Sequence, residues 1–450
     1  MISAHGNWQA LFSSGSCKLY KTSCKATGQY VALSYCWGKS LAYTTTTGNL
    51  KIHTQHGGIP FSQLPKTLQD AIFMVRYLNI GHLWADCLCI IQDDKADWEY
   101  EAAQMADVYS NAYLTIAATR ATHCGEGFLQ PRKVSDGDKV QFEDAQGHFQ
   151  ERVLAVRTLH FATNQMYWEC AHSFEEENGI VRASDTDFYK EYSLESLAKD
   201  QDAWERMVQE YTSREMTYQS DKFPALSGVI SALQKITGDT CYAGIWRSWF
   251  LLGLLWRIQH PDRDIYVFAP KQPRSVGFWR APSWSFGALE GVVLYDILQR
   301  ASRAWDFCSQ LEHCNVVPSG SNPLGELKSG YASIRGPLTV ISDTDQEIFG
   351  NTTNGKACKV HLSGHRYVYG GVYFDLEDYE TCNILMITPY DGLALRPVNA
   401  TTNTYVRVGA VWAFINMGII HESGAKQSFA VHESPLSAAD YPEPTLITLL

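Results

Sequence analysis

Carboxylates gather in one stretch of the chain, from Asp86 to Glu101, and they are its most evident candidates for chemistry. Asp86 lies inside an apolar run, where a charge without a partner is costly. Burial shifts the pKa of such a carboxylate, so it can serve as a catalytic group. The alternative is structural, with Asp86 paired to a backbone group or to Arg76. We predict that Asp86, Glu101 and Asp97 are catalytic.

Asp97 and Glu101 fall at the expected start of a helix, where the helix dipole favours acids even without a function. We expect their side chains to meet others in a crevice at the carboxyl ends of parallel strands, where α/β sheets bind ligands. The aromatic residues among them could form a wall or simply be core, and the glutamine could bind a ligand or close a turn. The predicted ligand-binding residues are Tyr35, Trp37, Gly38, Gln92 and Asp93.

The hydrophobic pattern predicts the elements that would position these residues. Apolar residues at helical spacing predict helices over 68–78 and 98–112. Between them, 82–91 is an apolar run typical of a buried strand. The alternation predicts an α/β fold, a parallel sheet with helices on both faces. Its neighbouring strands are predicted over 30–35, 83–90 and 112–118.

Other catalytic and metal-binding patterns are weak. Ser34 and His160 could suggest a hydrolase, but no G-x-S-x-G turn surrounds Ser34. Cys89 could pair with His82 or His160, but a cysteine in an apolar run has a raised pKa and is a poor thiolate. Cys87 and Cys89 lack a second Cys/His pair at zinc-like spacing, so no metal site is predicted. No G-x-G-x-x-G or Walker A motif is present, so no cofactor is evident.

Several sequence blocks in a fixed order resemble the fungal heterokaryon incompatibility (HET) domain. The first is Tyr-Val-Ala-Leu-Ser-Tyr-Cys-Trp-Gly at 30–38, and Leu-Pro-Lys-Thr follows at 64–67. A central block runs from Trp84 to Ala112, and 150–170 resembles the block that closes the domain. The chain departs from the family at Cys87, where Ser is more usual, and in the short segment 133–149.

The resemblance implies an effector of fungal nonself recognition that triggers growth arrest or cell death. HET domains are similar to TIR domains, so the resemblance also implies a TIR-like, flavodoxin-like core and NAD as a possible substrate. Cleavage of NAD would need a carboxylate beside an oxocarbenium-like centre. An NAD glycohydrolase, an enzyme of a secondary-metabolite pathway and a scaffold without chemistry therefore stay open. The implied partners are a second copy, another incompatibility protein or a small-molecule ligand.

The composition is that of a globular protein, with 45% hydrophobic and 19% charged residues among 450. A formal net charge of −11 disfavours binding to nucleic acid or to an anionic membrane. The sequence has neither a signal-peptide pattern nor an apolar run long enough to span a bilayer. Its 12 cysteines are too dilute for a disulfide scaffold. We therefore expect a cytoplasmic protein without membrane spans or disulfides.

Four segments are predicted: a short lead at 1–29, a HET domain at 30–175, a mainly helical extension at 176–330 and a β-rich domain at 331–450. Within the extension, the apolar run 246–256 predicts a buried helix. In the last segment, alternating apolar and polar residues separated by turn signals predict strands. These strands are expected at 331–334, 338–341, 367–374, 382–388, 405–411 and 428–431.

Overall fold

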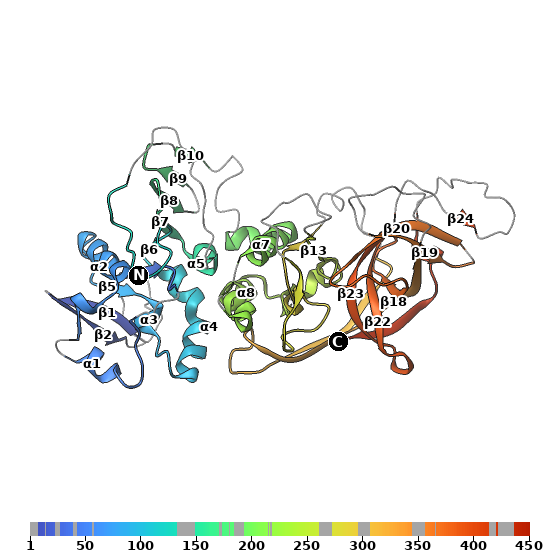
Figure 1. The fold of residues 1–450 in the computed structure, drawn as a ribbon, viewed down its shortest axis with the longest axis horizontal. Coiled ribbons are helices and arrows are strands. Elements are labelled where there is room, and N and C mark those ends of the chain that lie inside the picture. Colours follow the sequence, from blue (N-terminus) through green and yellow to red (C-terminus); the bar gives the residue numbers. More distant parts are fainter. Residues whose placement is uncertain are drawn as a thin grey trace. The chain divides into compact units, whose positions relative to one another are not determined.

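A computed structural model describes residues 8–13, 15–22, 28–38, 43–55, 58–132, 149–170, 173–179, 181–183, 193–214, 216, 218–260, 272–295, 307–343, 356–364, 366–413, 420–421 and 436–450 (Figure 1). The chain folds into two compact units. The first comprises 1–203, 214–237 and 320–325, and the second comprises 204–213, 238–319 and 326–450.

A ten-stranded sheet forms the centre of the first unit. Its strands are β1 (Trp8–Ser13), β2 (Ser16–Lys21), β3 (Val31–Ser34), β4 (Ile59–Pro60), β5 (His82–Trp84), β6 (Leu114–Ala117), β7 (Arg157–Phe161), β8 (Met166–Cys170), β9 (Ser173–Glu176) and β10 (Val181–Ala183). They lie in the order β10-β9-β8-β7-β6-β3-β5-β1-β2-β4. The pairs β5–β3, β3–β6 and β6–β7 are parallel, and the other neighbours are antiparallel.

Helices cover both faces of this sheet. They are α1 (Leu50–Thr54), α2 (Lys66–Tyr77), α3 (Asp86–Cys89), α4 (Lys95–Asn111), α5 (Phe149–Leu154), α6 (Leu194–Lys199) and α8 (Pro224–Thr237), with short 3-10 turns at Phe61–Gln63 and Gln219–Lys222. The connections through α2 and α4 run in opposite directions along the sheet, and right-handed crossovers then put these helices on opposite faces. Figure 1 shows α2 on one side of the central strands, with α4 and α5 on the other.

The two long helices form for the reasons that the sequence suggests. On α2, Leu68, Ile72 and Val75 recur at helical spacing and are fully buried, whereas Tyr77 faces outward and is 78% exposed. Burial of each large apolar side chain contributes about 1.5–3 kcal/mol. The helix α4 is capped at its N-terminus by Asp94, whose carboxylate accepts two backbone N–H groups of the first turn. The helices predicted over 68–78 and 98–112 are thus present.

The prediction of one strand over 83–90 is wrong. The strand β5 ends at Trp84, and the next residues form the helical turn α3. A loop supplies this turn with hydrogen bonds: the Thr45 N–H donates to the Cys87 carbonyl at 2.9 Å, and Thr45 Oγ1 donates to the Leu88 carbonyl at 2.7 Å. A short apolar run cannot distinguish a buried strand from a buried helical turn, because both are covered on all sides.

The second unit is β-rich, as predicted for the C-terminal part of the chain. Its large sheet contains β17 (Gln310–Pro318), β18 (Leu327–Asp343), β19 (Lys356–Leu362), β20 (Arg366–Phe374), β21 (Cys382–Met386), β22 (Asp391–Asn399), β23 (Thr404–Ala413), β24 (Ile420–His421) and β25 (Pro444–Leu449). They follow the order β21-β22-β23-β25-β18-β19-β20-β24, with β17 beside β18. The sheet closes on itself because β21 also pairs with β18, and β23 also pairs with β20.

The predicted strands of this unit are present with two qualifications. The segments 331–334 and 338–341 belong to the one long strand β18, and β17 adds a strand that begins at Gln310, before the predicted start. The segment 428–431 lies outside the described residues.

Smaller elements precede the large sheet in the second unit. They are α7 (Gln201–Ser213), β11 (Cys241–Tyr242), β12 (Ile245–Trp246), α9 (Phe250–Gly253), β13 (Arg257–Ile258), β14 (Arg274–Ser275), β15 (Leu289–Glu290) and β16 (Val293–Leu294), with 3-10 turns at Arg247–Trp249 and Phe286–Ala288. Two more 3-10 turns, Ala400–Thr402 and Ala438–Asp440, lie between strands of the large sheet. The helix predicted over 246–256 is wrong, because this run holds only the end of β12, a 3-10 turn and the single turn of α9. Its aromatic and aliphatic residues are buried by other segments, so apolarity alone did not require a helix.

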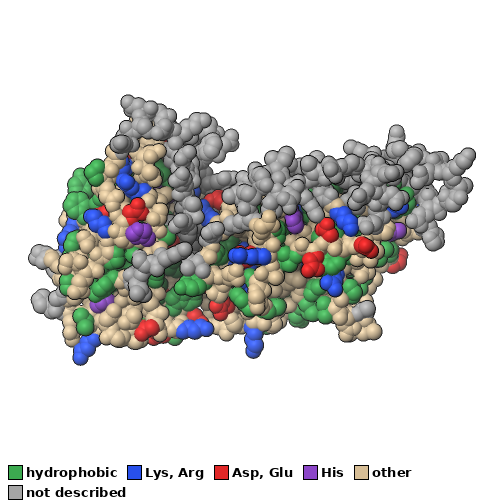
Figure 2. Space-filling model, viewed as in Figure 1, with side chains coloured by type: hydrophobic (Ala, Val, Ile, Leu, Met, Phe, Trp, Pro, Cys, Tyr) green, Lys and Arg blue, Asp and Glu red, His purple; other side chains and the backbone are tan. Residues whose placement is uncertain are grey.

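The sequence predicts no membrane-spanning segment, and the helices of the structure can be compared with that prediction. Among the described residues, no helix combines the length and the apolarity that crossing a bilayer requires. Acidic and basic side chains are interspersed on the face drawn in Figure 2.

Candidate functional site

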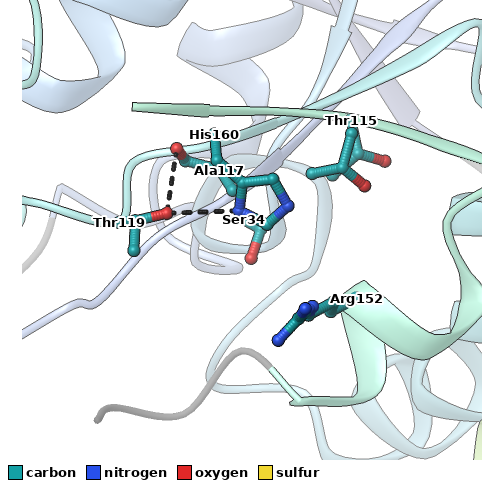
Figure 3. Close-up of a pocket in the computed structure, with 7 residues that line it drawn as sticks. Ser34, Thr115, Ala117, Thr119, Arg152 and His160 are labelled. Carbon is teal, nitrogen blue, oxygen red and sulfur yellow. Dashed lines mark hydrogen bonds between the residues drawn. The ribbon is translucent and has the colours of Figure 1, made fainter. Parts of the chain in front are cut away.

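Three neighbouring parallel strands bring polar side chains to one face of the first unit's sheet. The register places Ser34 of β3 beside Ala117 of β6, and Ala117 beside His160 of β7. Two residues earlier, Thr115 pairs with Thr158. Alternate residues of a strand face the same side, so these side chains share one face. Together with neighbours they line a small pocket (Figure 3), whose residues are Ser34, Thr115, Ala117, Thr119, Arg152, Thr158 and His160.

A buried carboxylate, that of Glu169, binds the Arg152 and His160 side chains that line this pocket. Glu169 of β8 is 2% exposed and accepts hydrogen bonds from Arg152 Nε and Nη2, each at 3.1 Å. Its Oε2 also lies 2.9 Å from His160 Nε2. Burial by itself raises the pKa of Glu169, but the charges and hydrogen bonds of Arg152 and His160 outweigh burial and lower this pKa well below its ordinary range. Glu169 therefore stays ionised, and it holds His160 with a proton on Nε2.

The second imidazole nitrogen of His160 reaches the pocket. Its Nδ1 lies 3.4 Å from Thr119 Oγ1, which lies 3.5 Å from the Ala117 carbonyl oxygen. The Tyr167 ring stacks on the imidazole with centroids 4.2 Å apart and an interplanar angle of 11°. Glu169, His160 and Thr119 thus form a carboxylate–imidazole–hydroxyl chain, in which the imidazole can accept or donate a proton.

Two hydroxyl groups of the pocket have no partner in the described part of the chain. Ser34 is 3% exposed and Thr115 is 1% exposed, yet neither Ser34 Oγ nor Thr115 Oγ1 has a hydrogen bond to a described residue. A buried hydroxyl without a partner costs about 1–3 kcal/mol. Native proteins pair most of their buried polar groups, so such atoms mark a place where a water, ion or ligand binds.

The predicted crevice at the end of β5 has a different character, because its carboxylates Asp86, Asp93 and Asp97 accept hydrogen bonds from the chain itself. Asp86 is the first residue of α3, and its carboxylate accepts hydrogen bonds from Trp37 Nε1 at 2.8 Å and from the Cys87 N–H at 2.7 Å. Gln92 Nε2 donates to the backbone oxygen of Asp86 at 3.1 Å and so closes the turn. Burial raises the pKa of Asp86 to about 6, although the hydrogen bonds from Cys87 and Trp37 oppose the shift.

Two further carboxylates of the predicted site, Asp93 and Asp97, accept hydrogen bonds from loop residues. Asp93 is exposed and accepts hydrogen bonds from Thr47 Oγ1 and the Thr47 N–H, both at 2.7 Å. These bonds lower the pKa of Asp93. Asp97 accepts the Ile91 N–H at 2.8 Å. Both carboxylates therefore stabilise the loops around α3, while their roles in catalysis and ligand binding stay predictions.

Glu101 lies away from any open rim. It is 0% exposed and belongs to the second turn of α4, since that helix begins at Lys95. The expectation that the helix start would bring Glu101 to an accessible edge is wrong for this reason. Its charge contributes to raising the pKa of the buried Cys89 thiol, after burial itself.

The residues that follow β3, which were predicted to bind a ligand in the crevice, are closely packed. Tyr35 is 5% exposed, and burial, then the neighbouring Cys87 and Asp86, raise its pKa well above the ordinary value. Gly38 has a φ of +74°, and a Cβ there would lie 2.3 Å from the Cβ of His123. Glycine is therefore required at position 38 by backbone conformation and by a close approach of the chain.

Metal and thiol chemistry receive no support from the described residues. Within the described ranges, no group of three or more His, Cys, Asp or Glu side chains could hold a metal ion. Cys87 and Cys89 are buried, and burial raises the pKa of both thiols well above the ordinary value. No disulfide joins the cysteines that the structure describes, and Cys24 lies outside them.

Comparison with known proteins identifies a domain within the chain. Residues 30–219 match the family described as "Heterokaryon incompatibility protein (HET)". The chain carries a HET domain. A curated relative from Neurospora crassa, "Heterokaryon incompatibility protein 6, OR allele", is 27% identical over 106 residues. That stretch is 22% of this chain and 15% of the relative, so the match spans a small part of both. No solved structure matches the chain.

The pocket of the HET domain contains residues that the sequence analysis missed. Ser34 and His160 were weighed as a hydrolase pair, and the structure brings both to the pocket. A signal was present in the sequence, since polar residues alternate with apolar ones at the ends of three strands, as in Leu-Ser, Leu-Thr-Ile-Ala and Arg-Thr-Leu-His-Phe. The missed residues are Thr115, Thr119, Arg152, Thr158 and Glu169.

Proposed function

We propose that the chain is an effector of fungal nonself recognition, whose activation arrests growth or kills the cell. The observation that carries this proposal is the HET match over 30–219. The matched range includes the central strands of the first unit from β3 to β10, and both polar centres described above. Activation would come from self-association or from another incompatibility protein. The incompatibility protein of Neurospora crassa named above supports this role through its partial likeness.

Inducible expression of the full chain in a filamentous fungus tests the proposal, with hyphal growth and uptake of a vital dye as readouts. A matched pair of glycine variants supplies the control. Gly38→Val places a side chain 2.3 Å from His123 at a φ of +74°, whereas a Cβ at Gly28 meets nothing within 4 Å. The full chain and Gly28→Val should arrest growth, and Gly38→Val should not. Normal growth with the full chain, both alone and in fusion with an incompatible strain, would contradict the proposal.

We propose NAD hydrolysis as a second candidate, and two observations favour it. The strand order β5-β3-β6-β7 is the 2-1-3-4 order of flavodoxin-like sheets, which supports a TIR-like core. Asp86 offers a carboxyl group with a pKa of about 6 beside the Trp37 indole, and an oxocarbenium-like centre needs a carboxylate. Glu169 is the less suitable carboxylate, because its negative charge is already neutralised by an ion pair with the Arg152 guanidinium.

Incubation of the purified full chain with NAD, followed by chromatography of the products, tests this second candidate. Release of nicotinamide by the wild type, and its loss in an Asp86→Asn variant that still unfolds cooperatively, is the expected result. Growth arrest without nicotinamide release would rule out the enzyme while leaving the effector role, so the two proposals fail separately.

A further inference from the structure

We infer that the pocket between β3, β6 and β7 binds an oxyanion, the carboxylate or phosphate end group of a small molecule. Nothing in the comparisons assigns a ligand to these residues. The inference does not rest on the effector role, since a ligand site could regulate an effector or serve an enzyme.

The hydroxyl groups supply the first argument. Ser34 and Thr115 are almost fully buried, and their oxygens have no hydrogen-bond partner among the described residues. Each hydroxyl carries a hydrogen that it can donate. Both groups come from neighbouring parallel strands and line the same pocket, so one ligand can accept both hydrogens. An oxyanion offers several acceptor oxygens at short spacing, which suits two convergent donors.

The charge of the pocket supplies the second argument. The Arg152 guanidinium of α5 and the His160 imidazole of β7 line it together with Ser34 and Thr115 (Figure 3). The nearby carboxylate of Glu169 is neutralised through bonds to these same two groups. None of the described lining residues carries a carboxylate. The Arg152 and Glu169 charges cancel, so protonation of His160 on Nδ1 gives the site the net positive charge and the extra donor that suit an oxyanion.

The size of the pocket limits what enters it. Its lining comes from residues of β3, β6 and β7, from Thr119 in the turn after β6 and from Arg152 of α5, and it is small. An end group fits such a space, whereas the rest of the ligand must lie outside. A phosphate monoester and a carboxylic acid share the chemistry that this site recognises, and the two differ in charge and in the number of oxygens.

Equilibrium dialysis of the full chain against labelled inorganic phosphate, and separately against labelled acetate, tests the inference. Ionic strength is held constant with chloride, so that general screening does not vary. Glycerol serves as the neutral probe. The variants Ser34→Ala and Thr115→Val each remove one hydroxyl while keeping the side-chain volume close to that of the wild type. Ser110→Ala, on α4 outside the pocket, is the matched control.

The expected result is saturable binding at one site, weakened about tenfold by Ser34→Ala and by Thr115→Val and unchanged by Ser110→Ala. Stronger binding of phosphate would indicate a phosphorylated ligand, and stronger binding of acetate a carboxylate. The inference is overturned if neither anion binds, if glycerol binds equally well, or if the pocket variants bind like the wild type. A crystal structure grown in phosphate that shows only an ordered water between Ser34 and Thr115 would overturn it too.

Discussion

The turn after β5 and the ends of β3, β6 and β7 lie along the same edge of one parallel sheet, but their polar groups are used differently. At the turn, Asp86, Asp93 and Asp97 all accept hydrogen bonds from the chain itself. In the pocket, Ser34 and Thr115 are buried without a described partner. The three carboxylates of the turn have hydrogen-bond partners, whereas the Ser34 and Thr115 hydroxyls of the pocket have none among the described residues.

The difference shows why charge in a sequence is an incomplete guide to function. A carboxylate that accepts backbone N–H groups stabilises a loop, and its presence needs no ligand. An unpaired buried hydroxyl lowers stability, so its presence calls for another explanation. Four variants test this comparison, because removal of a group with hydrogen-bond partners should lower stability, whereas removal of an unpaired group should not.

The largest effect is expected for Glu169→Gln. Loss of this charge leaves Arg152 and His160 facing each other in a buried site, and we expect a loss of about 3 kcal/mol in the free energy of unfolding. Urea denaturation at pH 7 measures it. Glu175→Gln, an exposed change on β9, is the control and should stay within about 0.5 kcal/mol. Equal stability of both variants would mean that the Glu169 cluster contributes nothing to the fold.

The lowered pKa of Glu169 also predicts how the free energy of unfolding changes with pH. The folded-state pKa of Glu169 is lowered from the ordinary 4.5, so its stabilisation is present above that pH and is lost as the pH falls further. The wild type should therefore lose stability faster than Glu169→Gln on acidification below about pH 4.5. Parallel pH curves for the two proteins would contradict the pairing.

For Asp86 we expect a smaller change in the free energy of unfolding, with the opposite dependence on pH. Its folded-state pKa is raised from 3.8 to about 6, so the folded protein binds this proton more tightly than the unfolded chain does. The contribution of Asp86 to stability is therefore most favourable at low pH and is lost as the pH rises through 6, by about 2 kcal/mol after allowance for partial exposure. Comparison of unfolding free energies for the wild type and Asp86→Asn between pH 4 and pH 7.5 isolates this contribution, because other groups cancel. A constant difference across that range would show an ordinary pKa.

A further test concerns the loop carboxylates of the turn. Asp97→Ala removes the acceptor of the Ile91 N–H, and we expect a loss of about 1 kcal/mol in unfolding free energy. Lys95→Ala, whose side chain is 79% exposed, is the neighbouring control. If Asp97→Ala folds with unchanged stability and yet abolishes growth arrest, the predicted catalytic role of Asp97 is favoured over the structural one.

The smallest effect is expected for Ser34→Ala, and its sign is the informative part. Removal of an unpaired hydroxyl should leave stability unchanged or raise it by up to about 1 kcal/mol in phosphate-free buffer. The same variant should lose anion binding. A loss of more than about 2 kcal/mol would show that the Ser34 hydroxyl has a structural partner, and the contrast between the two regions would disappear.

The sequence by itself determined the elements whose pattern has a clear period. The helices α2 and α4, the strands β3 and β6 and the β-rich second unit follow from spacing of apolar residues, because such spacing reports which faces are covered. The ordered blocks from Tyr30 to Ala112 also sufficed for the HET family. These features depend on residues close together in the chain, so they can be predicted from the sequence alone.

Only the tertiary structure decided what covers each face and which polar groups meet. The run after Trp84 becomes the turn α3 because Thr45, some 40 residues earlier, bonds to its carbonyls. Ser34, Thr115 and His160 share a pocket because three strands far apart in sequence pair in one register. Hydrogen-bond partners across a sheet are set by register and long-range packing, so composition and periodicity do not predict them.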